Sequence, residues 1–179
     1  GDGTLAVWQS DTMDFVRGFP LSDHKLRGAC LLPNGRLAIG AGNGQIHILD
    51  SEFLNEVATL EGHTGGVNCL AFHQKKSVLI SGGRDAHLRF WDSASWKQVR
   101  NIPAHNFAIY DIVFNEDQSL CATASFDKTL KIWSTHDFEK PLRLDHHNSG
   151  HRASVNALLW HESGVLCSAG DDKKIKLWK

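Results

Sequence analysis

A short phrase recurs along this chain every 41 to 45 residues, and no other feature constrains the fold as strongly. It reads "RDAHLRFWD" at 84–92, "FDKTLKIWS" at 126–134, "DDKKIKLWK" at 171–179 and "GDGTLAVWQ" at 1–9, with an aspartate six residues before a tryptophan. The aligned pairs are Asp2 and Trp8, Asn43 and Leu49, Asp85 and Trp91, Asp127 and Trp133, and Asp172 and Trp178. A period of this length indicates a stack of similar structural units.

Within one unit, four short segments have the composition of β-strands. They are "GVNCLAF" (66–72), "SVLISGG" (77–83), "HLRFWD" (87–92) and "WKQVRNI" (96–102), and polar turn residues separate them. No segment keeps a helical period for ten residues, so we expect almost no helix. Four antiparallel strands per unit predict an all-β chain built from the blades of a β-propeller. Stacking the blades would bury both apolar faces of each sheet.

The composition fits a soluble globular protein, with 41% hydrophobic and 22% charged residues. The net charge of −1 argues against nucleic acid or a membrane as a partner. The cysteines lie in apolar stretches without C-x-x-C spacing, so we expect buried free thiols in a reducing compartment, and hence a cytoplasmic protein. They are Cys30, Cys69, Cys121 and Cys167.

Each unit also has a histidine upstream of its strands, in "DH", "GH", "AH" and "GH" at 23–24, 62–63, 104–105 and 150–151. With these anchors the whole chain, 1–179, resembles a single WD-repeat β-propeller domain. The repeats would be 1–19 (the second half of a blade), 20–61, 62–103, 104–148 and 149–179 (three strands). The resemblance implies about 4.3 blades, which we interpret as the C-terminal part of a seven-bladed ring. A closed four-bladed ring, with residues 13–19 completing the last blade, is the alternative.

The resemblance also implies a structural tetrad of histidine, hydroxyl, aspartate and tryptophan in three repeats. These sets are His63, Ser81, Asp85 and Trp91; His105, Thr123, Asp127 and Trp133; and His151, Ser168, Asp172 and Trp178. The repeat at 20–61 keeps His24 but has Ile39, Asn43 and Leu49 at the other three places. We expect each complete set to be a buried hydrogen-bonded network.

Three features suggest chemistry, and each has a structural explanation. Ser, His and Asp recur in three units, whereas a catalytic triad occurs once beside an oxyanion hole, so we predict no catalytic residues. "GAGNGQ" (40–45) lacks the dinucleotide-binding frame and fits a turn between strands. His146 and His147, in "DHHNSGH" (145–151), are the one local histidine cluster, and we expect neither a metal site nor a cofactor there.

In propellers of this kind, binding uses the narrower face around the central channel. The resemblance directs to that face Arg27, Ala29, Gly42, Gly66, Asn68, Arg84, Ala108, Tyr110, Phe126, Ser154, Asn156 and Asp171. Aromatic residues and arginine are enriched in interface hot spots. We therefore predict a contact patch of Tyr110, Phe126 and Arg84 supported by Asn68, with Arg27, Asn156 and Asp171 around it.

These observations predict a non-enzymatic scaffold that presents a rigid surface to a protein or peptide partner. Self-association or further blades would close the arc. Two alternatives remain: a regulatory or sensor module of a larger protein, and a channel that binds a small ligand or metal.

Overall fold

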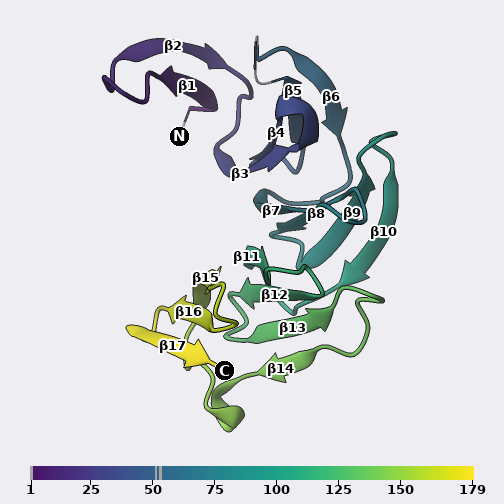
Figure 1. The fold of residues 1–179 in the computed structure, drawn as a ribbon, viewed down its shortest axis with the longest axis vertical. Helices are drawn as coiled ribbons and strands as arrows, with labels where there is room; N and C mark the ends of the chain where they lie inside the picture. The colour runs from purple at the N-terminus through teal and green to yellow at the C-terminus, as the bar shows by residue number, and fades with distance from the viewer. Residues whose placement is uncertain (1, 51, 53) are drawn as a thin grey trace.

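The strands form five antiparallel sheets within residues 2–50, 52 and 54–179, which the computed structural model describes (Figure 1). A hairpin comes first, with β1 (Thr4–Trp8) and β2 (Phe15–Pro20). Four strands follow in the next sheet: β3 (Leu26–Leu32), β4 (Arg36–Ala41), β5 (Ile46–Asp50) and β6 (Glu56–Leu60). The fold class predicted from the repeats, an all-β stack of propeller blades, is confirmed.

The remaining sheets repeat this plan. The third sheet contains β7 (Val67–His73), β8 (Val78–Gly83), β9 (His87–Asp92) and β10 (Gln98–Pro103), and the fourth contains β11 (Ile109–Phe114), β12 (Leu120–Ser125), β13 (Leu130–Ser134) and β14 (Leu142–Leu144). The last sheet has β15 (Val155–Trp160), β16 (Leu166–Gly170) and β17 (Lys174–Trp178). Each strand pairs with the next one along the chain, so every sheet is a simple meander.

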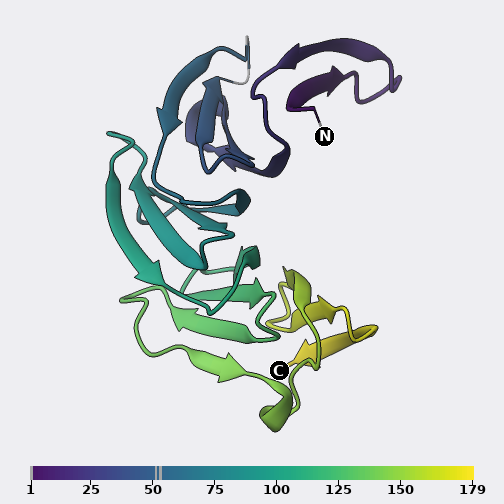
Figure 2. The ribbon, with the colours of Figure 1, turned by 180° about the vertical axis from the view of Figure 1, so that it is seen from behind.

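The sheets are arranged in an open arc, with β3, β7, β11 and β15 on its inner side (Figures 1 and 2). Two side chains link successive inner strands. The Asn68 side-chain amide donates to the Ile109 carbonyl at 2.9 Å, and the Leu158 N–H donates to the Asp111 carboxylate at 2.7 Å. These bonds tie β7 to β11 and β11 to β15.

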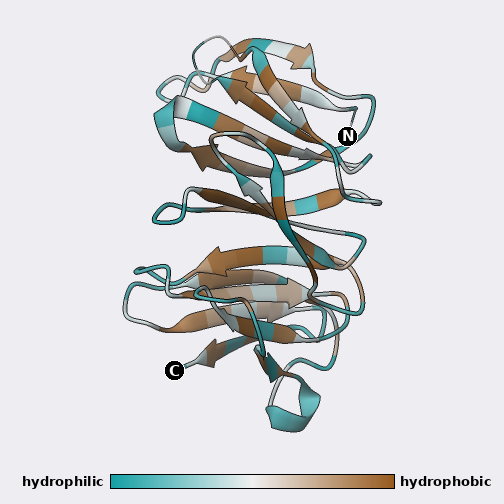
Figure 3. Ribbon diagram, turned by 90° about the vertical axis from the view of Figure 1, so that its right-hand side faces the viewer, coloured by the Kyte–Doolittle hydropathy of each residue, from teal (hydrophilic) through white to brown (hydrophobic). Residues whose placement is uncertain are grey.

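The hydrophobic cores lie between neighbouring sheets rather than within any one of them. Between the second and third sheets, Ile46 and Ile48 pack with Leu79 and Trp91. The apolar residues therefore run along the strands while polar residues collect in the turns (Figure 3). Gly82 shows how closely the sheets approach, because a Cβ there would lie 2.9 Å from Ile109 of the next sheet.

The strands and their pairing test two of the expectations directly. Helix is confined to two short 3-10 turns in the described residues, Pro33–Gly35 and His146–Asn148, and no described helix could cross a membrane. The closed four-bladed ring is wrong, because β2 pairs with β1 and does not complete the sheet of β17.

The prediction of buried thiols is confirmed for Cys69 and Cys121 and wrong for Cys30 and Cys167, which are half-buried. Cys30 borders an open groove near the end of β3, and Cys167 lies in the last sheet, which has a neighbouring sheet on one side of the arc. Burial raises the pKa of the Cys30, Cys69 and Cys121 thiols, which keeps them protonated.

Candidate interaction surface

A chain of hydrogen bonds crosses the third sheet through Ser81. The Trp91 indole N–H donates to the Ser81 hydroxyl at 2.8 Å, and that hydroxyl lies 2.7 Å from His63 Nε2. His63 Nδ1 lies 2.9 Å from the Asp85 carboxylate. One proton arrangement satisfies every bond: the hydroxyl donates to Nε2, and Nδ1–H donates to the carboxylate.

The same network occurs in the fourth and fifth sheets. The Thr123 hydroxyl accepts from the Trp133 indole at 3.0 Å and lies 2.8 Å from His105 Nε2. The Ser168 hydroxyl accepts from the Trp178 indole at 2.9 Å and lies 2.8 Å from His151 Nε2. The aspartates of these sheets, Asp127 and Asp172, lie 3.0 and 2.8 Å from their histidines. All three hydroxyls are buried and occupied, so none is an exposed nucleophile.

The sheet of β3 to β6 lacks this network. The His24 side chain is exposed, and the His24 backbone N–H donates to the Ser22 hydroxyl at 3.1 Å. Asn43 instead closes its turn by accepting the Gln45 N–H at 3.0 Å. A different pair lies in the same sheet, where the buried His47 Nδ1 is 2.8 Å from the Glu56 carboxylate.

The tetrad aspartates stay ionised and cap the turns that carry the rim. Burial alone would raise the pKa of Asp85, but the hydrogen bonds from His63, the Thr64 N–H and the Arg89 guanidinium outweigh it and hold the pKa well below its ordinary value. Asp127 has a lowered pKa for the same reason, through His105 and Thr129. An ionised carboxylate that accepts backbone N–H groups makes each turn rigid.

These turns place four equivalent residues at one rim of the arc: Gly42, Arg84, Phe126 and Asp171. In each turn this residue donates its N–H to the residue just before the inner strand begins, as Phe126 does to Ala108 at 2.9 Å. The backbone of the rim is therefore the same in all four sheets, and its chemistry differs only through the side chains.

Three aromatic rings meet on this rim. Phe126 is 49% exposed and makes edge-on contacts with Phe107, at 5.9 Å between ring centroids, and with Tyr110, at 6.3 Å. Phe107 is 57% exposed. We call Phe107, Tyr110 and Phe126 the aromatic cluster. Exposed aromatic rings that already contact one another form a preorganised apolar surface.

Phe107 was missing from the predicted patch. It lies two residues after the anchor His105, where the other tetrad repeats have Gly65 and Ala153. That comparison was available in the sequence. The contact with Phe126 was not, because it joins two separate turns of the sheet.

Beside the cluster, the inner strands border an open, shallow hollow of about 480 Å³ on the inner side of the arc. Its lining residues come one from each inner strand: Arg27, Asn68, Tyr110 and Asn156. Asn156 also donates to the Asp171 carboxylate. The structure thus brings four of the predicted residues together around the hollow. Two more predicted residues adjoin them: Phe126 contacts Tyr110, and Asp171 accepts from Asn156.

Arg84 lies in the equivalent turn of the neighbouring sheet. Among the described residues its guanidinium makes no cation–π contact with the aromatic cluster. Asn68 donates to the Ile109 carbonyl, so it supports the backbone beside Tyr110.

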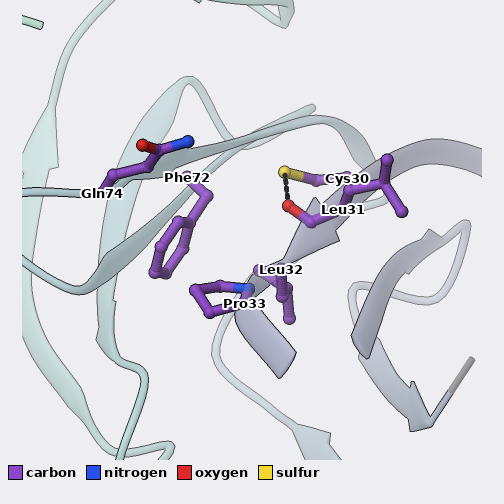
Figure 4. Close-up of a pocket in the computed structure, with 6 residues that line it drawn as sticks. All are labelled: Cys30, Leu31, Leu32, Pro33, Phe72 and Gln74. Carbon is purple, nitrogen blue, oxygen red and sulfur yellow. Dashed lines mark hydrogen bonds between the residues drawn. The ribbon is translucent and has the colours of Figure 1, made fainter. Parts of the chain in front are cut away.

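A second groove near the other ends of β3 and β7 offers little chemistry. Cys30, Leu31, Leu32, Pro33, Phe72 and Gln74 line its volume of about 480 Å³, and the Phe72 ring faces Pro33 (Figure 4). The Cys30 thiol donates to the Leu31 carbonyl. In the part of the chain that the structure describes, no three His, Cys, Asp or Glu residues are placed to hold a metal ion.

The repeats match a known family model, that of the WD domain, G-beta repeat, over residues 54–92, 96–134 and 143–179. These three segments make up more than half of the chain. The chain belongs to the WD40 family. Members of this family generally mediate protein–protein interactions.

Similar WD40-family proteins come from several organisms. The chain is 35% identical over 146 residues to the WD repeat-containing protein srw1 of Schizosaccharomyces pombe, which covers 79% of this chain and 25% of srw1. It is 36% identical over 58 residues to a THO complex subunit 6 homolog of Danio rerio, covering 32% of this chain and 18% of that protein. With human THO complex subunit 6 the identity is 33% over 103 residues, covering 51% and 30%. The chain therefore spans less than a third of the length of these relatives.

Proposed function

We propose that this chain is a non-enzymatic scaffold that binds a protein or peptide partner through the aromatic cluster and the adjoining hollow. The observation that carries the proposal is Phe126, a half-exposed phenylalanine in a tight turn that contacts two further aromatic rings. Covering such rings on binding is favourable, and aromatic anchors beside an arginine and amide groups are typical of interface hot spots. Arg27, Asn68 and Asn156 would supply the polar contacts.

Relatives of the chain support a protein partner. Three of them are named as subunits of complexes: the THO complex, the target of rapamycin complex and translation initiation factor 3. The occupied hydroxyls of the tetrads support a function without catalysis. Because the relatives are several times longer than their matched regions, the chain would act as a regulatory or binding module within a larger protein.

The proposal also covers the class of partner and the location of the protein in the cell. The net charge of −1 supports neither nucleic acid nor an anionic membrane as the main partner. The free thiols of the described cysteines support a reducing compartment, for which we propose the cytoplasm. Fractionation of cells that express the tagged protein would test the location.

The contact surface is tested by comparing partner capture between variants. We expect Phe107→Ala with Phe126→Ala to lower the recovery of crosslinked partners about tenfold, measured by quantitative mass spectrometry. Val57→Ala, which truncates an exposed apolar side chain on the outer strand β6, is the matched control and should capture normally. If the double variant captures as well as the control, the aromatic cluster is not the contact surface.

A further inference from the structure

A cleft of about 240 Å³ lies between the third and fourth sheets and shares no residue with the aromatic cluster. Apolar side chains and a basic rim line it: Val78, Ile80, Phe90, Val99 and Phe138, with His73, Lys76, Arg100, Thr135 and His136. We propose that this cleft is a second docking site, which takes a segment of a protein partner carrying a large apolar side chain next to an acidic residue.

The apolar wall of the cleft is fixed in place. Phe138 is buried, and its ring makes an edge-on contact with Phe90 at 4.7 Å between centroids. Lys76 donates to the Thr135 and His136 carbonyls, and Arg100 donates to the Asp137 carbonyl. The third sheet thus clamps the turn that carries Phe138, so the cleft is formed before any partner arrives.

Val99 stands exposed at the mouth of the cleft. It is the extra residue of a β-bulge between Gln98 and Arg100 on β10, the outermost strand of its sheet, and it is 60% exposed. An apolar group beside an apolar cleft gains free energy when a partner covers both. The volume is below the roughly 300–1,000 Å³ of cofactor and ligand pockets, which favours a single inserted side chain.

The charges on the rim of the cleft determine which charge is favoured on the partner residue beside the inserted apolar side chain. Lys76 and Arg100 are both on the rim, and the lining contains no aspartate or glutamate. Arg100 gives one of its five N–H donors to Asp137, so it retains donors for a carboxylate. The Asp137 carboxylate accepts the Glu139 N–H at 3.0 Å and closes its own turn. The rim therefore favours an acidic residue beside the inserted side chain.

The two histidines of the lining differ in what they can offer. His73 Nε2 lies 3.1 Å from the Gln118 carbonyl, and the Lys76 N–H donates to His73 Nδ1 at 3.2 Å. Both ring nitrogens are therefore occupied, and burial lowers the pKa of His73, which keeps it neutral. His136 is exposed at the rim. The positive charge that would meet a partner comes from Lys76 and Arg100.

Selection of peptides on the full chain tests the proposal. Random peptides displayed on phage are selected on the wild-type chain after depletion on the bare support. The enriched peptides are then tested on Val99→Glu, which blocks the mouth and reverses its charge preference. We expect Leu, Ile, Phe or Met next to Asp or Glu. Fluorescence polarisation should show binding weakened about tenfold by Val99→Glu and about fivefold by Arg100→Gln.

The preceding sheet provides a matched control. Val57 is 47% exposed on β6, 42 residues before Val99 and at the equivalent place, so Val57→Glu should leave binding unchanged. The proposal is wrong if no apolar–acidic peptides are enriched, if Val99→Glu binds them normally, or if Val57→Glu weakens them equally. Peptides lost on Phe126→Ala but kept on Val99→Glu would belong to the aromatic cluster and would also contradict it. If Val99→Glu fails to fold, Arg100→Gln decides alone.

Discussion

The hydroxyl group at the centre of each tetrad is the smallest unit on which a sheet depends. Ser81 accepts from the Trp91 indole and contacts His63, and all three side chains are buried. Removing the oxygen leaves two buried polar groups without partners, whereas the lost atom itself contributes little packing. The cost therefore depends on how deeply those partners are buried.

Ser81→Ala should lower the free energy of unfolding by about 1–3 kcal/mol for each orphaned group. Ser168→Ala should cost less, because water can reach the half-buried Trp178 in the last sheet. Urea denaturation of both variants measures the difference, with Ser10→Ala, an exposed turn serine, as the control. Equal losses for Ser81→Ala and Ser10→Ala would show that the network contributes no stability.

Acidification should destabilise the fold in two steps. Burial lowers the pKa of His73 and His105, so the unfolded chain takes up protons near pH 6.5 that the folded chain refuses, and stability falls as the pH drops below that value. Asp85 and Asp127 have lowered pKa values, so their contribution is present above about pH 4 and is lost as the pH falls through their folded pKa values. Urea midpoints measured between about pH 7.5 and 3 should fall first below about pH 6.5 and again below about pH 4. A constant midpoint down to about pH 5 would contradict the histidine step.

Among the secondary-structure elements, the turns that precede β2, β6, β10 and β14 share an unusual backbone feature. A large apolar residue adopts the left-handed conformation there, with φ of 59° at Met13, 60° at Leu54, 57° at Trp96 and 53° at Phe138. Such residues rarely take positive φ. Phe138 shows the compensation, because its ring packs against Phe90 of the preceding sheet. The turn therefore connects two strands and also fastens two sheets.

Substitutions at Phe138 should separate these two roles. Phe138→Ala should cost about 3–5 kcal/mol through the cavity it leaves. Phe138→Gly should be more stable than the alanine variant by about 1 kcal/mol, because glycine accepts positive φ without strain. Thermal and urea unfolding measure both. At Phe114, on the extended strand β11, the order should reverse. If the alanine variant is more stable than the glycine variant at both sites, the left-handed turn carries no strain.

These turns also separate what the sequence predicts from what it does not. The period, the strands and the meander follow from repeated apolar segments, because those patterns are local. The contacts of Phe138 and Phe107 could not be predicted from local patterns, because their partners lie elsewhere. Phe90 is in another sheet, and Phe126 is in another turn of the same sheet. Arg84 and Phe126 are equivalent in the repeat, yet only Phe126 has aromatic neighbours, and a single unit cannot reveal that.

The molecule as a whole is an arc with an uncovered apolar face on its last sheet. Leu159, Ile175 and Leu177 are exposed there, and Ile175 has 75% of its surface open. Stacked sheets elsewhere in the arc bury the equivalent faces. An exposed apolar sheet face is a surface for association, whether with another copy or with further blades.

We therefore expect the 179-residue chain to associate in solution. Ile175→Thr with Leu177→Thr should shift the mass measured by light scattering towards the 19.9 kDa of one chain, because less apolar surface is left to cover. Val57→Thr, which alters an outer strand, serves as the control. A wild-type chain that already runs as a monomer with a cooperative melt would contradict this expectation.

Tyr110 occupies a mechanically special place in this arc. Its neighbour Ile109 accepts a bond from Asn68 on one side, and its neighbour Asp111 accepts a bond from Leu158 on the other. A tensile load applied through a ligand on the Tyr110 ring would pass directly into three sheets instead of bending one strand. Attachments at this point should therefore resist force better than attachments to an outer strand, and bond lifetimes under load would depend on Asn68 and Asp111 although neither need touch the ligand.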